Sequence, residues 1–151
     1  MELLSKRRIC KMVVPKFRLF DKNKGNIIDS SKIMNINFEN KSIMVLNKIL
    51  EEDNFTQKDY SEHTFKNIVL MQSTGLKDKN DKEIFEGDIL AVETDDEVIN
   101  VRIFWDEKHA LFMFESKKYN ENELLAELVE DNTYPFEIIG NIYEDKELLD
   151  A

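Results

Sequence analysis

LMQSTGLKDKNDKEIFEGDILAV, at residues 70–92, is the segment on which the predicted fold depends. Its short apolar runs are separated by residues that tolerate left-handed backbone or bond their own backbone in turns, namely Thr74, Gly75, Asp78, Asn80 and Asp81. The second half, IFEGDIL, predicts a strand, a tight turn at Gly87 and another strand. A glycine between two β-prone apolar pairs allows the sharp reversal by which small barrels pass from one sheet layer to the next.

The chain that follows this segment predicts a hairpin, a helix and a final strand. Residues 98–105 form a long β-prone run, residues 106–109 (DEKH) a turn, and residues 110–114 the antiparallel partner. Residues 136–143 predict the last strand, and residues 145–149 a last helical turn.

A short helix is predicted over residues 121–130. Its apolar residues recur at helical spacing, at Leu124, Leu125, Leu128 and Val129. Asn120 is a good N-cap, and Glu123 follows at the spacing of a capping box.

The N-terminal part predicts two hairpins and a linker. Residues 17–28 form the first hairpin around the turn sequence DKNKGN, and residues 34–38 alternate and pair with residues 43–46. Residues 47–63 are polar and lack sustained periodicity, so we expect a mobile linker there.

These patterns together predict a mainly β (α+β) protein. We expect a small SH3-like or KOW-like C-terminal β-barrel with one short helix, preceded by an N-terminal β-hairpin subdomain. The predicted division is a basic leader expected to be disordered (residues 1–15), the hairpin subdomain with its linker (residues 16–64), and the barrel domain (residues 65–151). The natural start is open between Met1 and Met12.

Three strings resemble the YopX family of phage and prophage proteins: KFRLFDK (residues 16–22), LMQSTGLKDKNDKEIFEGDIL (residues 70–90) and FEIIGNIYEDKELL (residues 136–149). Their order and spacing make the resemblance specific. Two departures, Asp81 where the family commonly has Gly and Lys146 where it commonly has Pro, both suit a turn or helix start. The resemblance implies a phage or mobile-element protein with a mostly β C-terminal barrel, in a family of uncharacterised activity with no assigned catalytic residue.

The net charge of the chain limits the classes of partner that it can bind. The formal net charge is −10. Because the leader is basic, the net charge of the rest of the chain is more negative than this total. Such a surface repels nucleic acid and anionic membranes and attracts a basic protein surface. The single cysteine, Cys10, excludes an internal disulfide, and the sequence has no long apolar run or secretory signal pattern. We therefore expect the cytoplasm of a bacterial host.

The residues that could carry chemistry are sparse, and we expect no catalytic, cofactor-binding or metal site. Two histidines and one cysteine are too few for a structural zinc site, and phosphate-binding glycine loops are absent. A metal site at His109 with Asp106 and Glu107 stays open, although a solvated hairpin tip is the simpler interpretation. For Asp88, the simplest role is to accept backbone hydrogen bonds in its turn.

The aromatic residues are the remaining candidate for function. We predict a binding or assembly surface formed by Trp105, His109, Phe112, Phe114 and Tyr134, because strand alternation must turn some of them outward. Core packing is the alternative role for most of them. Sheet edges that need covering also favour a homo-oligomer.

Three functions follow from these observations. The first is a non-enzymatic phage or mobile-element accessory protein that self-assembles and binds a host or phage macromolecule, such as a host protein with a basic surface, in countering host defence. The second is a binder or enzyme for a small molecule or nucleotide, with the ligand at a subunit interface. The third and weakest is a nucleic-acid-binding SH3-like module, which would require Lys77, Lys79, Lys82 and Arg102 to cluster.

Overall fold

The computed structural model describes residues 14–150. The predictions made for the leader, including Cys10 and the choice between Met1 and Met12, fall on residues outside this part. Within it, twelve strands form three antiparallel sheets with one α-helix, α1 (Leu125–Asp131), and three 3-10 helices at Ser30–Lys32, Phe65–Asn67 and Lys146–Asp150.

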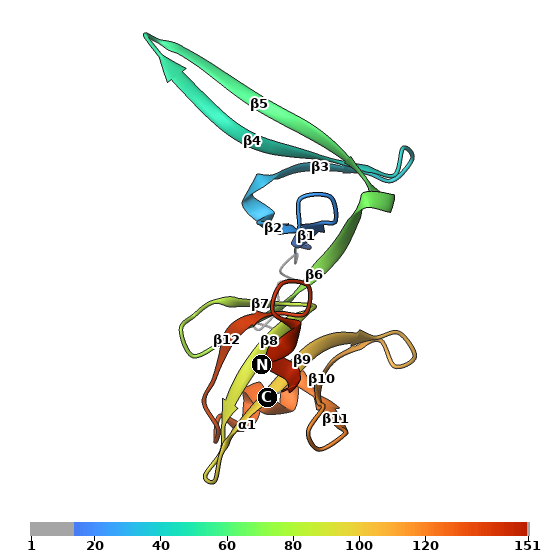
Figure 1. Cartoon of the computed structure of the whole chain (residues 1–151), viewed down its shortest axis with the longest axis vertical. Coiled ribbons are helices and arrows are strands. Elements are labelled where there is room, and N and C mark those ends of the chain that lie inside the picture. The colour runs from blue at the N-terminus through green and yellow to red at the C-terminus, as the bar shows by residue number, and fades with distance from the viewer. Residues whose placement is uncertain (1–13, 151) are drawn as a thin grey trace, which may run out of the picture.

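The three sheets stack along the long axis of the molecule (Figure 1). The lower sheet has the order β11 (Glu121–Leu124), β10 (Leu111–Ser116), β9 (Val98–Asp106), β8 (Asp88–Glu93) and β12 (Phe136–Asn141). The middle sheet has the order β2 (Asn26–Ile28), β1 (Phe17–Asp21), β6 (Ile68–Lys77) and β7 (Glu83–Phe85). The upper sheet contains β3 (Ile33–Asn37), β4 (Ser42–Glu52) and β5 (Phe55–Thr64).

The lower sheet is a curled half-barrel, and its edge strands β11 and β12 do not pair with each other. The predicted class, mostly β with one short helix, is confirmed. The predicted hairpins over residues 17–28, 34–46 and 98–114 are also present, as β1–β2, β3–β4 and β9–β10. The SH3-like assignment within this class stays a prediction.

Strand β6 opens the segment singled out in the sequence and joins the upper and lower parts of the molecule (Figure 1). Residues 68–72 pair with β1, whereas Ser73 and Lys77 pair with β7. The register shifts between these two residues, where Gly75 has a φ of +76°. The predicted turn at Thr74 and Gly75 is therefore an irregularity inside one long strand, because the segments on both sides find partners in the same sheet.

The turn between β6 and β7 is held by a buried carboxylate. Asp78 accepts backbone N–H bonds from Asn80, Lys82 and Ile138, each at 2.9 Å. Burial opposes ionisation of Asp78, but these N–H groups hold its pKa below the usual value. Because Ile138 lies in β12, the same side chain fixes the turn and attaches it to the edge of the half-barrel.

Gly87 makes the predicted reversal between β7 and β8, and with it the chain passes from the middle to the lower sheet. Its φ is +87°, and an added Cβ would lie 3.3 Å from both Met71 Sδ and Tyr143 Cε2. Its backbone N–H donates to Ile103 (2.8 Å) and its carbonyl accepts from Ile142 (2.9 Å). The position therefore requires glycine for both conformation and space.

Two apolar clusters fill the molecule. The lower one lies in and beside the half-barrel and contains the buried residues Ile84, Leu90, Val92, Val101, Ile103, Leu125 and Phe136. The upper one contains the buried residues Leu19, Ile43, Val45 and Ile68. Each cluster comes mainly from strands, whose alternate side chains face inward.

A buried ion pair connects the middle and lower sheets. Arg18 Nη2 of β1 donates to Asp88 Oδ1 of β8 at 2.6 Å, with side-chain exposures of 13% and 1%. Asp88 Oδ2 accepts the backbone N–H of Phe85 at 2.7 Å, so the predicted role of Asp88 in its turn is confirmed. Burial raises the pKa of Asp88, and the Arg18 charge only partly offsets this.

The linker predicted over residues 47–63 is wrong, because these residues belong to β4 and β5. The two strands pair as far as their tip, with one register shift between Leu46 and Lys48. At the tip, Asp53 and Asn54 have φ values of 39° and 68°, typical of a two-residue type I′ turn. Alternation is weak here because both faces of the ribbon contact solvent. We call residues 46–60 the arm, which projects from the upper end of the molecule (Figure 1).

The helix was predicted to start too early. Residues 121–124 pair with β10 as strand β11, and the helix begins only at Leu125, after an N-cap residue that makes no side-chain cap bond. Asn120 has a φ of +54° and lies in the β10–β11 turn. Residues 121–124 take their backbone partners from β10 and not from a helical turn, so the local capping signal is overridden.

Candidate functional site

The register of the half-barrel places aromatic and acidic side chains on the face covered by α1. Phe114 of β10 is opposite Ile103 of β9 and opposite Glu123 of β11. Two residues further along β10, Ser116 is opposite Glu121. Because directly opposite residues share a face of the sheet, both glutamates point to the same side as Phe114.

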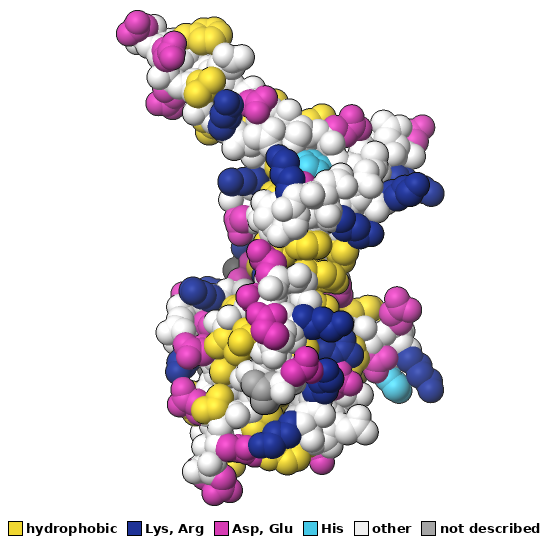
Figure 2. Space-filling view, viewed as in Figure 1, with side chains coloured by type: hydrophobic (Ala, Val, Ile, Leu, Met, Phe, Trp, Pro, Cys, Tyr) yellow, Lys and Arg dark blue, Asp and Glu magenta, His cyan; other side chains and the backbone are white. Residues whose placement is uncertain are grey.

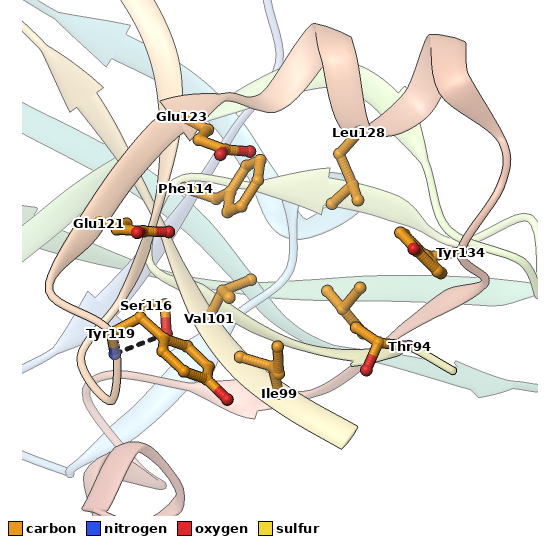
Figure 3. Close-up of a pocket in the computed structure, with 11 residues that line it drawn as sticks. Thr94, Ile99, Val101, Phe114, Ser116, Tyr119, Glu121, Glu123, Leu128 and Tyr134 are labelled. Atoms are coloured by element: carbon orange, nitrogen blue, oxygen red, sulfur yellow. Dashed lines mark hydrogen bonds between the residues drawn. The ribbon is translucent and has the colours of Figure 1, made fainter. Parts of the chain in front are cut away.

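These side chains surround a pocket of about 190 Å³ (Figure 3). Its lining is mostly apolar, and comprises Val92, Thr94, Ile99, Val101, Phe114, Ser116, Tyr119, Glu121, Glu123, Leu128 and Tyr134. Leu128 and Tyr134 enter from α1 and from the loop that follows it, opposite Phe114 (Figure 3). The pocket therefore combines an apolar floor, aromatic walls and two carboxylates.

The side of the pocket near the β8–β9 turn is held by hydrogen bonds. Thr94 Oγ1 donates to the Glu97 carbonyl at 2.7 Å and accepts the Glu97 N–H at 3.1 Å. The Glu97 carboxylate accepts the Tyr119 hydroxyl and also pairs with Lys118. Tyr119 N–H donates to Ser116 Oγ at 3.3 Å (Figure 3). Hydrogen bonds of the side-chain hydroxyl and of the backbone N–H thus fix the position of Tyr119.

A second hollow, of about 530 Å³, continues from the pocket along the helix and shares Phe114, Glu123, Leu128 and Tyr134 with it. Together they form what we call the acidic groove, lined by those residues and by Glu121, Glu127, Glu130 and Asp131. Among the described residues, none of its five acids has a lysine, arginine or histidine within ion-pair distance. The groove is therefore a concentrated and uncompensated negative surface beside apolar side chains.

The structure places the five residues of the predicted aromatic surface in three different surroundings. Phe114 and Tyr134 lie together in the groove. Trp105 and Phe112 form an edge-to-face pair with centroids 4.9 Å apart, in which Trp105 is 37% exposed and Phe112 packs against the lower core. His109 lies in the β9–β10 turn, apart from the pocket lining. The pocket therefore holds two of the five residues, and a single binding or assembly surface that includes all five stays a prediction.

His109 is an exposed hairpin-tip residue. Its Nδ1 lies 2.6 Å from Asp106 Oδ2, and this hydrogen bond lowers the pKa of the Asp106 carboxyl. Within residues 14–150, no group of three or more His, Cys, Asp and Glu side chains converges as a metal site would require. The contact with Asp106 accounts for the position of the histidine in the turn.

One serine, histidine and aspartate set occurs near the base of the arm. Ser61 Oγ lies 2.9 Å from His63 Nε2, and His63 Nδ1 lies 3.7 Å from Asp21 Oδ2. The Ser61 hydroxyl donates to Asn47 Oδ1 at 2.9 Å, so its proton is directed away from the histidine. Asp21 meanwhile accepts backbone N–H bonds of its own turn. This arrangement ties the arm to the β1–β2 turn and does not activate a nucleophile.

Three of the four basic residues that nucleic-acid binding would require form ion pairs, and only Lys82 has no ion-pair partner within residues 14–150. Lys77 pairs with Asp81 at 3.3 Å, Lys79 with Glu93 at 2.8 Å, and Arg102 with Glu115. Another hollow, of about 550 Å³, is lined by Arg102, Lys117 and Lys146 among other residues. There Lys117 also has a carboxylate partner, Asp150. These pairs weaken the attraction that either surface offers to a phosphate.

The acidic residues of the groove were not predicted from the sequence. Glu121 and Glu123 alternate with Asn122, which is the pattern of a strand with two acids on one face. Their assignment to a helix would have placed them on different faces. The signal was present, but it conflicted with a capping box only one residue away.

The half-barrel and the groove define a small, mostly β protein whose most distinctive surface is an apolar pocket surrounded by acids. Residues 16–150 match the model of the YopX family, described as YopX protein, and the chain therefore belongs to this family. The resemblance noted in the sequence is confirmed. A search of curated proteins finds no match.

Two solved structures are similar to this chain. The crystal structure of protein EF1440 from Enterococcus faecalis shares 27% identity with a TM-score of 0.63, covering 91% of this chain and 99% of that one. The X-ray structure of protein yopX from Bacillus subtilis shares 17% identity with a TM-score of 0.56, covering 88% of this chain and 96% of that one. The second likeness is one of fold alone. In the described part of the chain, the helices are all too short or too polar to cross a membrane.

Proposed function

We propose that this YopX-family protein is a non-enzymatic accessory protein of phage or mobile-element origin, which assembles with copies of itself and binds a basic segment of a host or phage protein in the acidic groove. The observation that carries the proposal is a set of five carboxylates that have no ion-pair partner within residues 14–150 and are arranged around Phe114, Leu128 and Tyr134. A host-defence protein with a basic surface belongs to this class of partner.

The chemistry of the groove suits a lysine or arginine side chain. The aliphatic part of such a side chain contacts apolar groups while its charged end reaches carboxylates or an aromatic face. Phe114 and Tyr134 offer the apolar and aromatic contacts, and Glu121 and Glu123 stand at the same pocket. The net charge of −10 adds long-range attraction for a basic partner.

The charge of the acidic groove separates this proposal from the nucleotide alternative. The pocket of about 190 Å³ accommodates one or two side chains, and the carboxylates around it attract cations and repel phosphates. Nucleic acid is disfavoured by repulsion between the phosphates and the same carboxylates. A thermal-shift screen of nucleotides should accordingly leave the unfolding midpoint unchanged.

Calorimetric titration with short peptides tests the proposal. A peptide with lysine or arginine beside an apolar residue should bind, and its affinity should fall as salt is raised, whereas an acidic peptide of the same length should not bind. The variant E121Q/E123Q should weaken binding by about tenfold. The control E39Q/E62Q changes the net charge equally at exposed positions outside the groove and should retain most of the affinity.

Affinity capture from host cells extends the test to the natural partner. The wild-type protein should enrich a basic protein that E121Q/E123Q does not enrich and E39Q/E62Q still does. Equal binding of basic peptides by the wild type and E121Q/E123Q would refute the role of the groove.

A further inference from the structure

The arm leaves one strand edge open for pairing. Strand β3 covers β4 only from Ser42 to Val45, and no other strand of residues 14–150 pairs with that side of the arm. On its other side, β4 pairs with β5 up to the tip. An isolated two-stranded ribbon is at best marginally stable in water. The free edge of β4 is therefore a ready template for another strand.

The exposed side chains at this edge are apolar at its centre and charged on either side. Ile49 is 50% exposed and Leu50 is 45% exposed, although both lie in a regular strand. Lys48 precedes them, and Glu51 and Glu52 follow. Figure 2 shows hydrophobic side chains at the surface of the projecting arm, beside acidic and basic ones.

The tip turn determines which backbone groups face outward. A two-residue turn makes Glu52 and Phe55 a hydrogen-bonded pair, so the N–H and C=O groups of Glu52 and Leu50 point toward β5. The backbone groups of Ile49 and Glu51 then point to the open edge. Regular antiparallel pairing with another strand requires outward residues to meet outward residues.

We propose that the β4 edges of two copies of this chain pair antiparallel about a two-fold axis at Leu50. In this register Ile49 of one copy meets Glu51 of its partner and exchanges backbone hydrogen bonds with it, twice by symmetry. Leu50 faces Leu50 on the axis, and Lys48 of each copy faces Glu52 of the other. The two arms then form one four-stranded sheet, with the order β5, β4, β4 and β5.

Charge selects this register over its neighbours. Within one arm, Lys48 is opposite Asp59 of β5. In the dimer it would lie between that aspartate and the Glu52 of the partner, on the same face as Leu50. A shift of the axis by one residue puts Ile49 on it and places Lys48 opposite Leu50. Such a shift keeps the backbone parity needed for pairing but loses both charge pairs.

Complementary charge reversals give the test, with mass measured by analytical ultracentrifugation across the micromolar range. The wild type should sediment with the mass of two chains. K48E and E52K should each sediment as single chains, because like charges then meet twice, and the dimer dissociation constant should rise by about tenfold or more. An equimolar mixture of the two variants should recover the mass of two chains, since opposite charges again meet at both positions.

The variant K58E is the matched control. It makes the same charge change on the same arm, but on β5 and on the opposite face from Lys48, and it should still dimerise. Recovery in the mixture cannot arise from misfolded chains, which keeps the test meaningful if a single variant is unstable. A single-chain mass for the wild type, no recovery in the mixture, or equal loss in K58E would each overturn the proposal.

The proposed function includes self-assembly, and the β4 edge is the surface that we assign to it. The dimer proposal rests on self-assembly alone and not on peptide binding in the groove. The acidic groove lies on the lower sheet, so peptide binding in the groove should be unchanged in K48E and E52K. Failure of the charge-reversal test would therefore leave peptide binding standing, and failure of the peptide test would leave the dimer standing.

Discussion

Replacement of Asp88 by asparagine tests whether the buried pair with Arg18 holds the middle and lower sheets together. The carboxylate accepts two bonds at once, from Arg18 at 2.6 Å and from the Phe85 N–H at 2.7 Å. An asparagine offers one acceptor oxygen, and its NH₂ group would face one of these two donors. Either the guanidinium then keeps only its long hydrogen bond to the Glu86 carbonyl, at 3.4 Å, or the backbone N–H of Phe85 is left without an acceptor.

The expected loss follows from the burial of the pair. The Arg18 side chain is 13% exposed, and within residues 14–150 its Nε has no hydrogen-bond partner. Little water can therefore solvate the guanidinium once the carboxylate charge is removed. Breaking such a buried ion pair from one side costs about 3–5 kcal/mol. That amount is a large part of the total stability of about 5–15 kcal/mol that a domain has.

Urea-induced unfolding, followed by circular dichroism and by the fluorescence of Trp105, measures the loss. The double variant R18M/D88N should lose less than the sum of R18M and D88N, because it no longer buries an unpaired charge. The exposed pair of Lys77 and Asp81 supplies the control, since K77Q should leave the unfolding midpoint unchanged.

The pH dependence of the stability of the R18M variant has a definite sign. Burial raises the folded-state pKa of Asp88 above the unfolded value, and the Arg18 charge opposes this rise. R18M removes that opposition, so in R18M the contribution of Asp88 to stability should be fully present below the unfolded pKa of the carboxyl and be lost as pH rises through the folded pKa. The D88N background should abolish this fall. A D88N variant about as stable as the wild type, or additive losses in the double variant, would refute the reasoning.

Three further outcomes follow from the same structure. In thermal unfolding, Gly87→Ala should cost about 1–3 kcal/mol more than Gly25→Ala, because both have positive φ but only the first adds a close Cβ contact. Asp78→Ala should cost about 2 kcal/mol or more and should flatten the acid limb of the stability curve, since a depressed carboxyl pKa gives stability above the unfolded pKa that is lost as pH falls. In an NMR titration, His109→Ala should raise the pKa of Asp106 toward its ordinary value, and an unchanged value would show that the hydrogen bond does not cause the shift.

Features with a local cause were predicted well. The reversal at Gly87 depends on one residue whose missing side chain permits positive φ, and the structure places it there. Asp78 and Asp81 are turn residues for similarly local reasons. The hairpins over residues 17–28 and 98–114 follow from alternation on both sides of a short polar turn.

Features that depend on competition between distant partners were not predicted. The capping signal at Asn120 is genuine, but pairing with β10 satisfies more backbone groups than one capped helical turn would. The arm has no buried face and so no apolar alternation, and the structure alone shows the turn at Asp53 and Asn54. The groove was missed for the same reason as β11, because its acids become neighbours only when that strand pairs.

The sequence by itself determined the family, the mostly β class and the turns at Asp78 and Gly87, because backbone preferences at glycines, aspartates and alternating apolar residues act over a few bonds. Only the tertiary structure decided that β6 pairs with β1 along one half and with β7 along the other, and that Arg18 pairs with Asp88. The same holds for the carboxylates of β11 and α1, which line one groove. Such contacts join residues far apart in the chain. The free energy of these contacts depends on which strands pair and which side chains they exclude from water. A local sequence pattern does not contain that information.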